Sequence, residues 1–515
     1  MNHLTSLSCR LVALIALLGG LGSGCDWSGR ENSGVAGANA EPSTKTGVQV
    51  IKESPEDCSK RLAEIRTLYD SIPEDLRRDD GGQETVSKRV ARCRNMLELW
   101  LRSCSESRVE GAAEARFWLA RLLLGLFDIY KNNLEAKKVP KESIRRYATE
   151  YLDRVASLCR EFLVLAPDKH EQRGPVLDFM ADVLLRNKKH AAALQVYLQV
   201  IKDHADYKEM YKTVLGASRC HMELRKPEES LKLIEEFIDK EPEESSRLKL
   251  MRARWNPLLI LGDFERMGDY LEETETFIRD NLQRDDLSTH QRLDFLTQLI
   301  PVIYRRIVFL LFPTGKFEEA RQATLNFLAE VPKLKNAAKK IKRNLAVADS
   351  YVLFANLVKV ALEELAGRPL PFPGDEVVWA TGRQVTADEQ KGKVTVLVFR
   401  NSSDKRTLPF LQALDKFTRD NEKSMNLVWI SRTTKRDMGP ELAKLQDAVQ
   451  KAELSHAAVG FDADVDQSKL YKRYEAPLLS GSFVVIDKDG RVVFHLLDPQ
   501  WKHVGVAINV LRQYL

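Results

Sequence analysis

The cysteines are the residues of this chain whose type and spacing could carry nucleophilic or redox chemistry. Seven occur among 515 residues: Cys9, Cys25, Cys58, Cys93, Cys104, Cys159 and Cys220. No two of them form a CxxC pair, the arrangement in which one thiol is commonly activated for disulfide exchange. Because none follows Cys220, thiol chemistry in the second half of the chain would need a cysteine supplied by the first half.

Three of these cysteines are placed where a disulfide could form. Cys93 and Cys104 fall on one predicted helix and are about 16 Å apart, too far for a bond between them. Cys58 lies on the apolar face of the preceding predicted helix, which should run antiparallel, so it could reach either Cys93 or Cys104. The sequence leaves this choice open, and also the alternative that no disulfide forms. Cys159 and Cys220 are expected to be small buried apolar side chains.

Cys25 follows a segment that is typical of export. The apolar run Leu11–Leu21 (LVALIALLGGL) is too short to cross about 30 Å of hydrocarbon as a helix, but it suits a signal sequence. With the small residues Gly22–Gly24 before the cysteine, residues 1–25 resemble a bacterial lipoprotein signal. Leu21 is one residue further from the cysteine than is usual there. The resemblance implies lipidation of Cys25; a plain cleaved signal with an incidental cysteine is the alternative.

Residues 26–54 are predicted to be a flexible linker, because they contain few apolar residues among Ser, Gly, Asn, Glu and Pro. A flexible segment of this length has an r.m.s. reach of roughly 30 Å. The expected location is therefore the cell envelope, on the periplasmic face of a bacterial membrane, with the lipid on Cys25 as the membrane contact. Inner and outer membranes both remain open.

Residues 55–366 show helical periodicity almost throughout. Apolar residues recur three and four positions apart, as in Cys58, Leu62, Ile65 and Tyr69, and Pro and Gly are expected between the periodic segments rather than inside them. One segment resembles the second helix of a tetratricopeptide repeat, with its turn glycine, small crossing residue, apolar pair and closing proline at Gly315, Phe317, Ala320, Thr324, Phe327, Leu328 and Pro332. Weaker copies are expected to close at Pro167, Ala205 and Pro242. The resemblance implies an array that binds a protein or peptide; a generic helical bundle is the alternative.

Residues 367–515 change character after a proline-rich stretch and alternate short apolar runs with helical segments. Strands are predicted at 394–399, 426–431, 457–461, 482–486 and 491–496, and helices at 408–419, 440–452 and 504–515. The last two strands are joined by Asp487–Gly490, a strong hairpin turn. The fold class is therefore multidomain, with an all-α repeat region followed by an α/β domain.

The runs at 391–399 and 483–494 make this domain resemble the thioredoxin superfamily, in the TlpA-like and alkyl hydroperoxide reductase–thiol-specific antioxidant branch. That family needs a cysteine at the helix N-terminus after the first core strand. Here the place reads Arg400-Asn401-Ser402-Ser403-Asp404, without a cysteine, and Gly481 falls where the family has its cis-proline. Ser402, Ser403 and Asp404 are better suited to cap a helix, because oxygen cannot form the mixed disulfide of thiol exchange.

Other chemistries find little support. Lys and Arg number 79 against 74 acidic residues, too balanced for a dedicated nucleic-acid binder. Asp462, Asp464 and Asp466 begin like a calcium loop, but Gln467 and Arg473 stand where glycine and glutamate are needed. The histidines His456, His495 and His503 share no metal-ligand spacing, so no metal site and no cofactor is expected.

The preferred interpretation is an exported, lipid-anchored interaction or scaffold protein whose thioredoxin-like domain has lost its redox centre. The alternative is a thiol–disulfide oxidoreductase or peroxidase-like enzyme that uses a cysteine of the helical region, such as Cys93 or Cys104. A third possibility is a carrier that holds a small ligand near Ser402, Ser403 and Gly481.

Overall fold

The computed structural model describes ten segments of the chain: 54–72, 83–104, 111–340, 347–369, 376–400, 408–431, 439–462, 469–474, 481–497 and 501–515. Cys25, Ser402, Ser403, Asp404, Asp464 and Asp466 lie outside them. Within the described residues, no helix combines the length and the apolar character needed to cross a bilayer.

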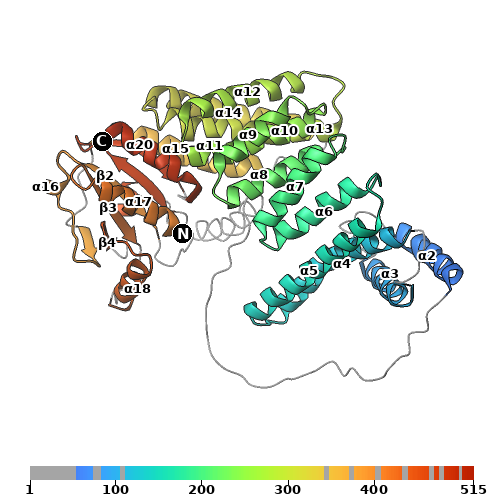
Figure 1. Cartoon of the computed structure of the whole chain (residues 1–515). Helices are drawn as coiled ribbons and strands as arrows, with labels where there is room; N and C mark the ends of the chain where they lie inside the picture. Colours follow the sequence, from blue (N-terminus) through green and yellow to red (C-terminus); the bar gives the residue numbers. More distant parts are fainter. Residues whose placement is uncertain are drawn as a thin grey trace.

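The first part of the molecule is all-α (Figure 1). Its helices are α2 (Pro55–Asp70), α3 (Gln83–Cys104), α4 (Ala112–Ala136), α5 (Lys141–Leu165), α6 (Arg173–Arg186), α7 (His190–Asp203), α8 (Met210–Glu223), α9 (Pro227–Ile238), α10 (Glu244–Ala253), α11 (Trp255–Leu261), α12 (Phe264–Leu282), α13 (Thr289–Arg306), the π-helical turn η1 (Ile307–Leu311), α14 (Phe317–Lys340) and α15 (Val347–Glu364). Consecutive helices pack against each other along the array, which gives the repeat-like architecture expected from the sequence.

Small residues set the close approaches within this array. The Tyr197 ring of α7 lies against Gly216 of α8, where an added β-carbon would come within 2.3 Å of the ring. The Tyr197 hydroxyl donates to Asp182 of α6 at 2.5 Å, so one side chain ties three successive helices together. Ala193 and Ala217 are fully buried at the same crossings. This packing is what the repeat pattern in the sequence predicts.

The prediction that Pro332 ends its helix is wrong, because α14 continues through it to Lys340. The nearby side chains explain why. Phe327, Val331 and Ala338 are at most 1% exposed, and burial of one large apolar side chain contributes about 1.5–3 kcal/mol, which offsets the ~3 kcal/mol cost of an internal proline. Pro301 likewise lies inside α13, so prolines do not only mark boundaries in this region.

The second part is an α/β domain with one six-stranded sheet of order β1-β4-β3-β2-β5-β6. Its elements are β1 (Val377–Trp379), α16 (Ala387–Gln390), β2 (Val394–Phe399), α17 (Leu408–Asp420), β3 (Met425–Ser431), α18 (Gly439–Lys451), β4 (Ala457–Asp462), α19 (Lys469–Arg473), β5 (Ser482–Ile486), β6 (Val492–Leu497), the 3₁₀ turn η3 (Trp501–His503) and α20 (Val504–Tyr514). Strands β2, β3 and β4 run parallel through helical crossovers, whereas β5 and β6 add an antiparallel hairpin beside β2. This is a thioredoxin-like topology.

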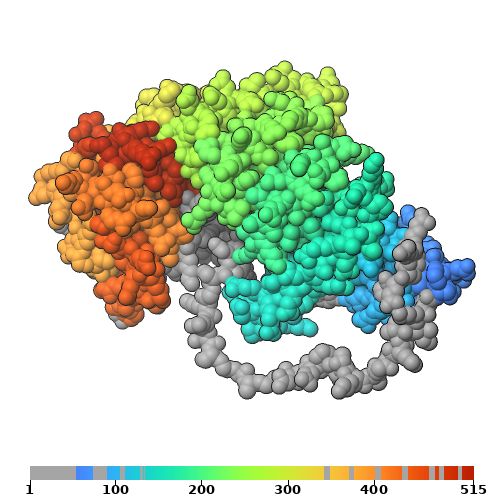
Figure 2. Space-filling view, viewed as in Figure 1, coloured from blue at the N-terminus to red at the C-terminus, as the bar shows by residue number. Residues whose placement is uncertain are grey.

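The two parts share one hydrophobic core rather than a flexible joint. Buried apolar residues form a continuous cluster that extends from Leu231 in α9 to Leu511 in α20. Helix α20 packs on α11, and the space-filling view shows its surface continuous with that of the helical array (Figure 2). Gly367 at the start of the proline-rich stretch donates its N–H to Val492 O at 2.8 Å, so the connection itself is tied to β6. The α/β domain is therefore held in a fixed orientation on the array.

Candidate functional site at the carboxyl edge of the sheet

A row of buried polar residues lies where the parallel strands end. Strand β2 is followed by Arg400, β3 ends at Ser431, and β4 ends at Asp462. Ser482, the first residue of antiparallel β5, is paired with Phe399 and so lies at this same edge. All four are at most 2% exposed. The carboxyl edge of parallel strands is where α/β proteins usually place ligand-binding and catalytic groups, so this edge is the candidate site.

Backbone and aromatic contacts fix the geometry of the edge. The Trp429 indole N–H donates to Arg400 O at 3.0 Å, and the Tyr471 hydroxyl donates to Ile430 O at 3.2 Å. The Phe399 ring packs against Tyr471 and Tyr474, with centroids 5.1 and 5.4 Å apart. These contacts fix the ends of β2 and β3 relative to each other and to α19.

Gly481 lies directly against the end of β2. It has φ +72°, and a β-carbon there would meet Phe399 O at 2.2 Å and Arg400 Cδ at 2.8 Å. Both the left-handed backbone and the close approach require glycine. No cis peptide bond occurs in the described segments. Position 481, beside the candidate site, therefore has no side chain that could contact a substrate.

Ser482, at the described part of this edge, is not an activated nucleophile. The Ser482 hydroxyl is buried and has no hydrogen-bond partner, so no base is positioned to take its proton. Asp462 Oδ2 accepts the backbone N–H of Leu470 at 3.1 Å and so supports the start of α19. The loop residues Ser402, Ser403 and Asp404, predicted to cap the next helix, lie outside the described segments, and α17 is described from Leu408 onwards.

The three histidines of this domain belong to different parts of it: His456 directly precedes β4, His495 is in β6 and His503 is in η3. Burial lowers the pKa of His495 to about 4 and, together with Lys502, that of His503 to about 3, so both are neutral near pH 7. His503 packs on Phe309 of η1, in the contact between the two parts of the molecule. His456 Nδ1 lies 3.8 Å from Glu422. In the segments that the structure describes, no three metal-ligating side chains come together.

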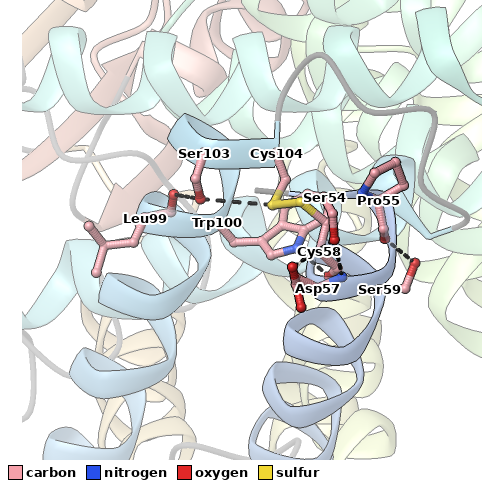
Figure 3. The surroundings of a disulfide bond; sticks show 9 residues. All are labelled: Ser54, Pro55, Asp57, Cys58, Ser59, Leu99, Trp100, Ser103 and Cys104. Carbon is pink, nitrogen blue, oxygen red and sulfur yellow. Dashed lines mark hydrogen bonds between the residues drawn. A yellow bond between two sulfur atoms is a disulfide. The ribbon is translucent and has the colours of Figure 1, made fainter. Parts of the chain in front are cut away.

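The structure joins Cys58 of α2 to Cys104 of α3 by a disulfide, with Cα atoms 5.9 Å apart (Figure 3). The Trp100 indole N–H donates to Cys58 O at 2.8 Å beside the bond, so two ties hold α2 on α3. Of the two partners that the sequence left open for Cys58, Cys104 is the one bonded, and Cys93 stays a buried free thiol.

The free thiols are unsuited to exchange chemistry. Burial raises the pKa of Cys93 to about 11 and the pKa values of Cys159 and Cys220 to about 12, so these sulfurs are protonated near neutral pH. All three belong to a core cluster of the first helices, separate from the cluster that contains the sheet. Figure 1 shows α2 and α3 at the end of the array remote from the sheet, so no cysteine of this end serves the carboxyl edge.

The strand-end residues Arg400, Ser431 and Ser482 were missed from the sequence, although a signal was present. A polar residue directly borders each predicted apolar run: Arg400 follows VTVLVF, Ser431 follows NLVWI, and Ser482 precedes FVVI. When such runs alternate with helices, parallel strands bring their carboxyl ends to one edge. The pattern of the runs, rather than any motif, identifies the site.

Comparison with known proteins finds solved structures that resemble each of the two parts separately. No protein-family model and no curated protein matches the chain. Among solved structures, a thiol-disulfide isomerase from Corynebacterium glutamicum is 15% identical over 29% of this chain and 96% of its own, with a TM-score of 0.25. Copper-bound ScoI of Bradyrhizobium japonicum is 20% identical over 29% of this chain and 99% of its own, with a TM-score of 0.22.

The helical part is similar to tetratricopeptide-like repeats of a putative kinesin light chain from Podosopora anserina. The identity is 14%, over 45% of this chain and 100% of that chain, and the TM-score is 0.31. With scores this low, the fold assignment rests on the strand order and the helix packing described above.

Proposed function

We propose that the chain is an exported, lipid-anchored protein-interaction scaffold in which a redox-degenerate thioredoxin-like domain is fixed to a helical repeat array. The repeat array would bind a protein or peptide, and the linker after Cys25 would hold the folded part off the periplasmic face of a bacterial membrane. The disulfide between Cys58 and Cys104 supports an oxidising compartment. The proposal makes no use of a cofactor or of nucleic acid.

One observation carries the proposal. The thioredoxin-like domain contains no cysteine at all, and the free thiols in the described segments, Cys93, Cys159 and Cys220, are buried and protonated in a separate core cluster. Thiol–disulfide exchange needs a thiolate that can form a mixed disulfide. A TlpA-like domain without one retains the rigid sheet and its carboxyl edge, which can still present a binding surface.

The full-length chain is expected to show no thiol-dependent catalysis. Insulin reduction and hydrogen peroxide consumption should proceed at the rate of the buffer with reductant alone, because no accessible thiolate is available. Alkylation of the native protein with iodoacetamide should leave both rates unchanged. Activity above background that alkylation abolishes would overturn the scaffold proposal and favour the oxidoreductase alternative.

Lipid anchoring at Cys25 is tested by Cys25→Ser, with Cys9→Ser inside the signal segment as the matched control. We expect wild type and Cys9→Ser in the membrane fraction and Cys25→Ser in the soluble periplasmic fraction or uncleaved, because the lipid anchor is attached through the Cys25 sulfur and serine cannot replace it. Labelling with radioactive palmitate gives the direct measurement. Equal membrane association or equal labelling of the two variants would contradict lipidation at Cys25.

A further inference from the structure

A cavity of about 670 Å³ lies at the amino edge of the sheet, the edge opposite the candidate site. Its walls come from Lys393, which directly precedes β2, from Asn426 near the start of β3, and from the loop 382–386 before α16. Figure 1 shows α16 on the side of this domain away from the helical array. The volume is in the range of small-molecule sites, and every lining residue belongs to the described segments.

Hydrogen bonds hold the loop over this cavity in place. The Thr381 hydroxyl donates to Arg383 O at 3.2 Å and accepts the N–H of Val459 in β4 at 3.3 Å. At the other end of the loop, Thr386 and Glu389 form a capping box, in which the Glu389 carboxylate accepts the Thr386 N–H at 2.8 Å. The loop is thus tied to β4 and to α16, which lowers the conformational cost of binding a ligand.

Two basic side chains line the cavity without a carboxylate partner. Arg383 and Lys393 are half-buried, and neither forms an ion pair within the described segments. Lys393 Nζ donates to a main-chain oxygen, Glu422 O, at 3.4 Å. The Glu422 carboxylate lies 3.8 Å from His456 Nδ1 instead. A ligand carboxylate can therefore pair with Arg383 and Lys393 without displacing an acidic side chain from either of them.

Asn426 adds a buried polar group with one unused atom to the cavity wall. The residue is 3% exposed, and its Nδ2 donates to Glu389 O at 3.2 Å. This hydrogen bond fixes which end of the amide carries the oxygen, so Oδ1 is turned away from Glu389 O. Oδ1 accepts no hydrogen bond from any residue that the structure describes. Because buried acceptors are normally satisfied, a ligand N–H has a place to donate here.

We propose that this cavity binds a short peptide with free termini. The peptide carboxylate pairs with Arg383 and Lys393, and a peptide N–H donates to Asn426 Oδ1. The terminal ammonium group lies near Glu422. Two cations and two carboxylates, Glu389 being the second, line the cavity, so its lining has no net charge and favours a zwitterion over a simple anion. This inference goes beyond the scaffold function and does not depend on it.

Isothermal titration calorimetry of the full-length chain with trialanine tests the site. The groups to be recognised occur in every unmodified tripeptide, so trialanine contains all of them. Three further probes each lack some of these groups: trialanine amide lacks the carboxylate, N-acetyltrialanine lacks the ammonium group, and inorganic phosphate supplies an anion alone.

The cavity variant is Arg383→Gln/Lys393→Gln, and its matched control is Arg219→Gln/Lys232→Gln. Arg219 in α8 and Lys232 in α9 are exposed and form no ion pair within the described segments. The control therefore makes the same change of charge outside the cavity. Neither variant loses an ion pair, so both should melt close to the wild-type temperature.

We expect trialanine to bind wild type and the control variant with equal affinity. Its affinity for the cavity variant should be at least about tenfold lower, because the carboxylate loses both charged partners. Trialanine amide should lose affinity for wild type to a similar extent and for the same reason. N-acetyltrialanine should also bind wild type more weakly than trialanine, because it has no charge to place near Glu422.

Two results would overturn the inference. One is a lack of trialanine binding to wild type, or equal binding to wild type and the cavity variant. The other is inorganic phosphate that binds wild type as tightly as trialanine and displaces it, because the cavity would then recognise an anion rather than a peptide. Both results leave the scaffold proposal intact, since that proposal rests on the repeat array and on the missing cysteine.

Discussion

Gly505→Ala is expected to loosen the thioredoxin-like domain from the helical array. Gly505 lies in the first turn of α20, at the point where this helix crosses the end of α11. A β-carbon there would be 1.9 Å from Ile260 O and 2.9 Å from Gly262 N. These are backbone atoms, which cannot rotate away as a side chain does, so α20 must move outward and carry its buried contacts with it.

Two effects of opposite sign determine how Gly505→Ala changes the free energy of unfolding. Replacement of an exposed helical glycine by alanine stabilises a helix by up to about 1 kcal/mol. Forcing extra volume into a close-packed contact costs about 1–3 kcal/mol, and here the displacement also weakens the hydrogen bond from Asn509 Nδ2 to Gly262 O and the packing of His503 on Phe309. The steric cost outweighs the gain in propensity, so the net effect is destabilising.

Thermal unfolding and limited proteolysis measure this effect. We expect a lower melting temperature for Gly505→Ala and faster cleavage between the array and the sheet, near residues 365–376. Gly382→Ala is the matched control, because no atom lies within 4 Å of its added β-carbon and the residue belongs to the same domain. If Gly505→Ala melted and cleaved like Gly382→Ala, the rigid contact between the two parts would be refuted.

The fold was readable from the sequence wherever a residue pattern had a single structural solution. The apolar runs at 394–399 and 482–486 could only be buried strands, and they appear as β2 and β5 with the same bounds. The prolines were less informative, because Pro301 and Pro332 lie inside helices whose other side chains are well buried. Tertiary packing overrode the local signal there, which no single segment could reveal.

The relation between the two parts could not be predicted, for a physical reason. The contact depends on Gly262 and Gly505, which are 243 residues apart in the sequence (505 − 262) and have no side chain to leave a pattern. The proline-rich stretch suggested a boundary at 366–367, yet Gly367 is bonded to β6 and the core continues across it. A change of composition shows where one kind of segment gives way to another. It does not show whether the second segment packs against the first.

The sequence drew attention to Gly481 and to the loop after residue 400, of which Ser402, Ser403 and Asp404 lie outside the described segments. The absence of cysteine was certain from the sequence, and the edge beside Gly481 is where the structure gathers Arg400, Ser431, Asp462 and Ser482. These residues lie in or directly after four different strands, so their proximity follows from strand register rather than from sequence spacing.

Loss of the Cys58–Cys104 disulfide, in Cys58→Ala/Cys104→Ala, is expected to free α2 from the end of the array. The bond closes a loop of 46 residues between its cysteines, which in the chain-entropy description is worth roughly 4 kcal/mol at most and about 2–4 kcal/mol in practice. The hydrogen bond from Trp100 to Cys58 O and the burial of Leu62 and Ile65 remain. This hydrogen bond and these buried side chains still stabilise α2 on the array, but they are not covalent.

Hydrogen exchange followed by mass spectrometry tests this locally. Amides of α2 should lose about thirtyfold or more of their protection, whereas those of β2 and β3 should be unchanged, because they belong to a different core cluster. Wild type treated with a phosphine reductant should behave like the double variant, and the same reductant should not alter the variant further. Equal protection of α2 in oxidised and reduced wild type would contradict the prediction. It would mean that Leu62, Ile65 and Trp100 stabilise α2 fully without the disulfide.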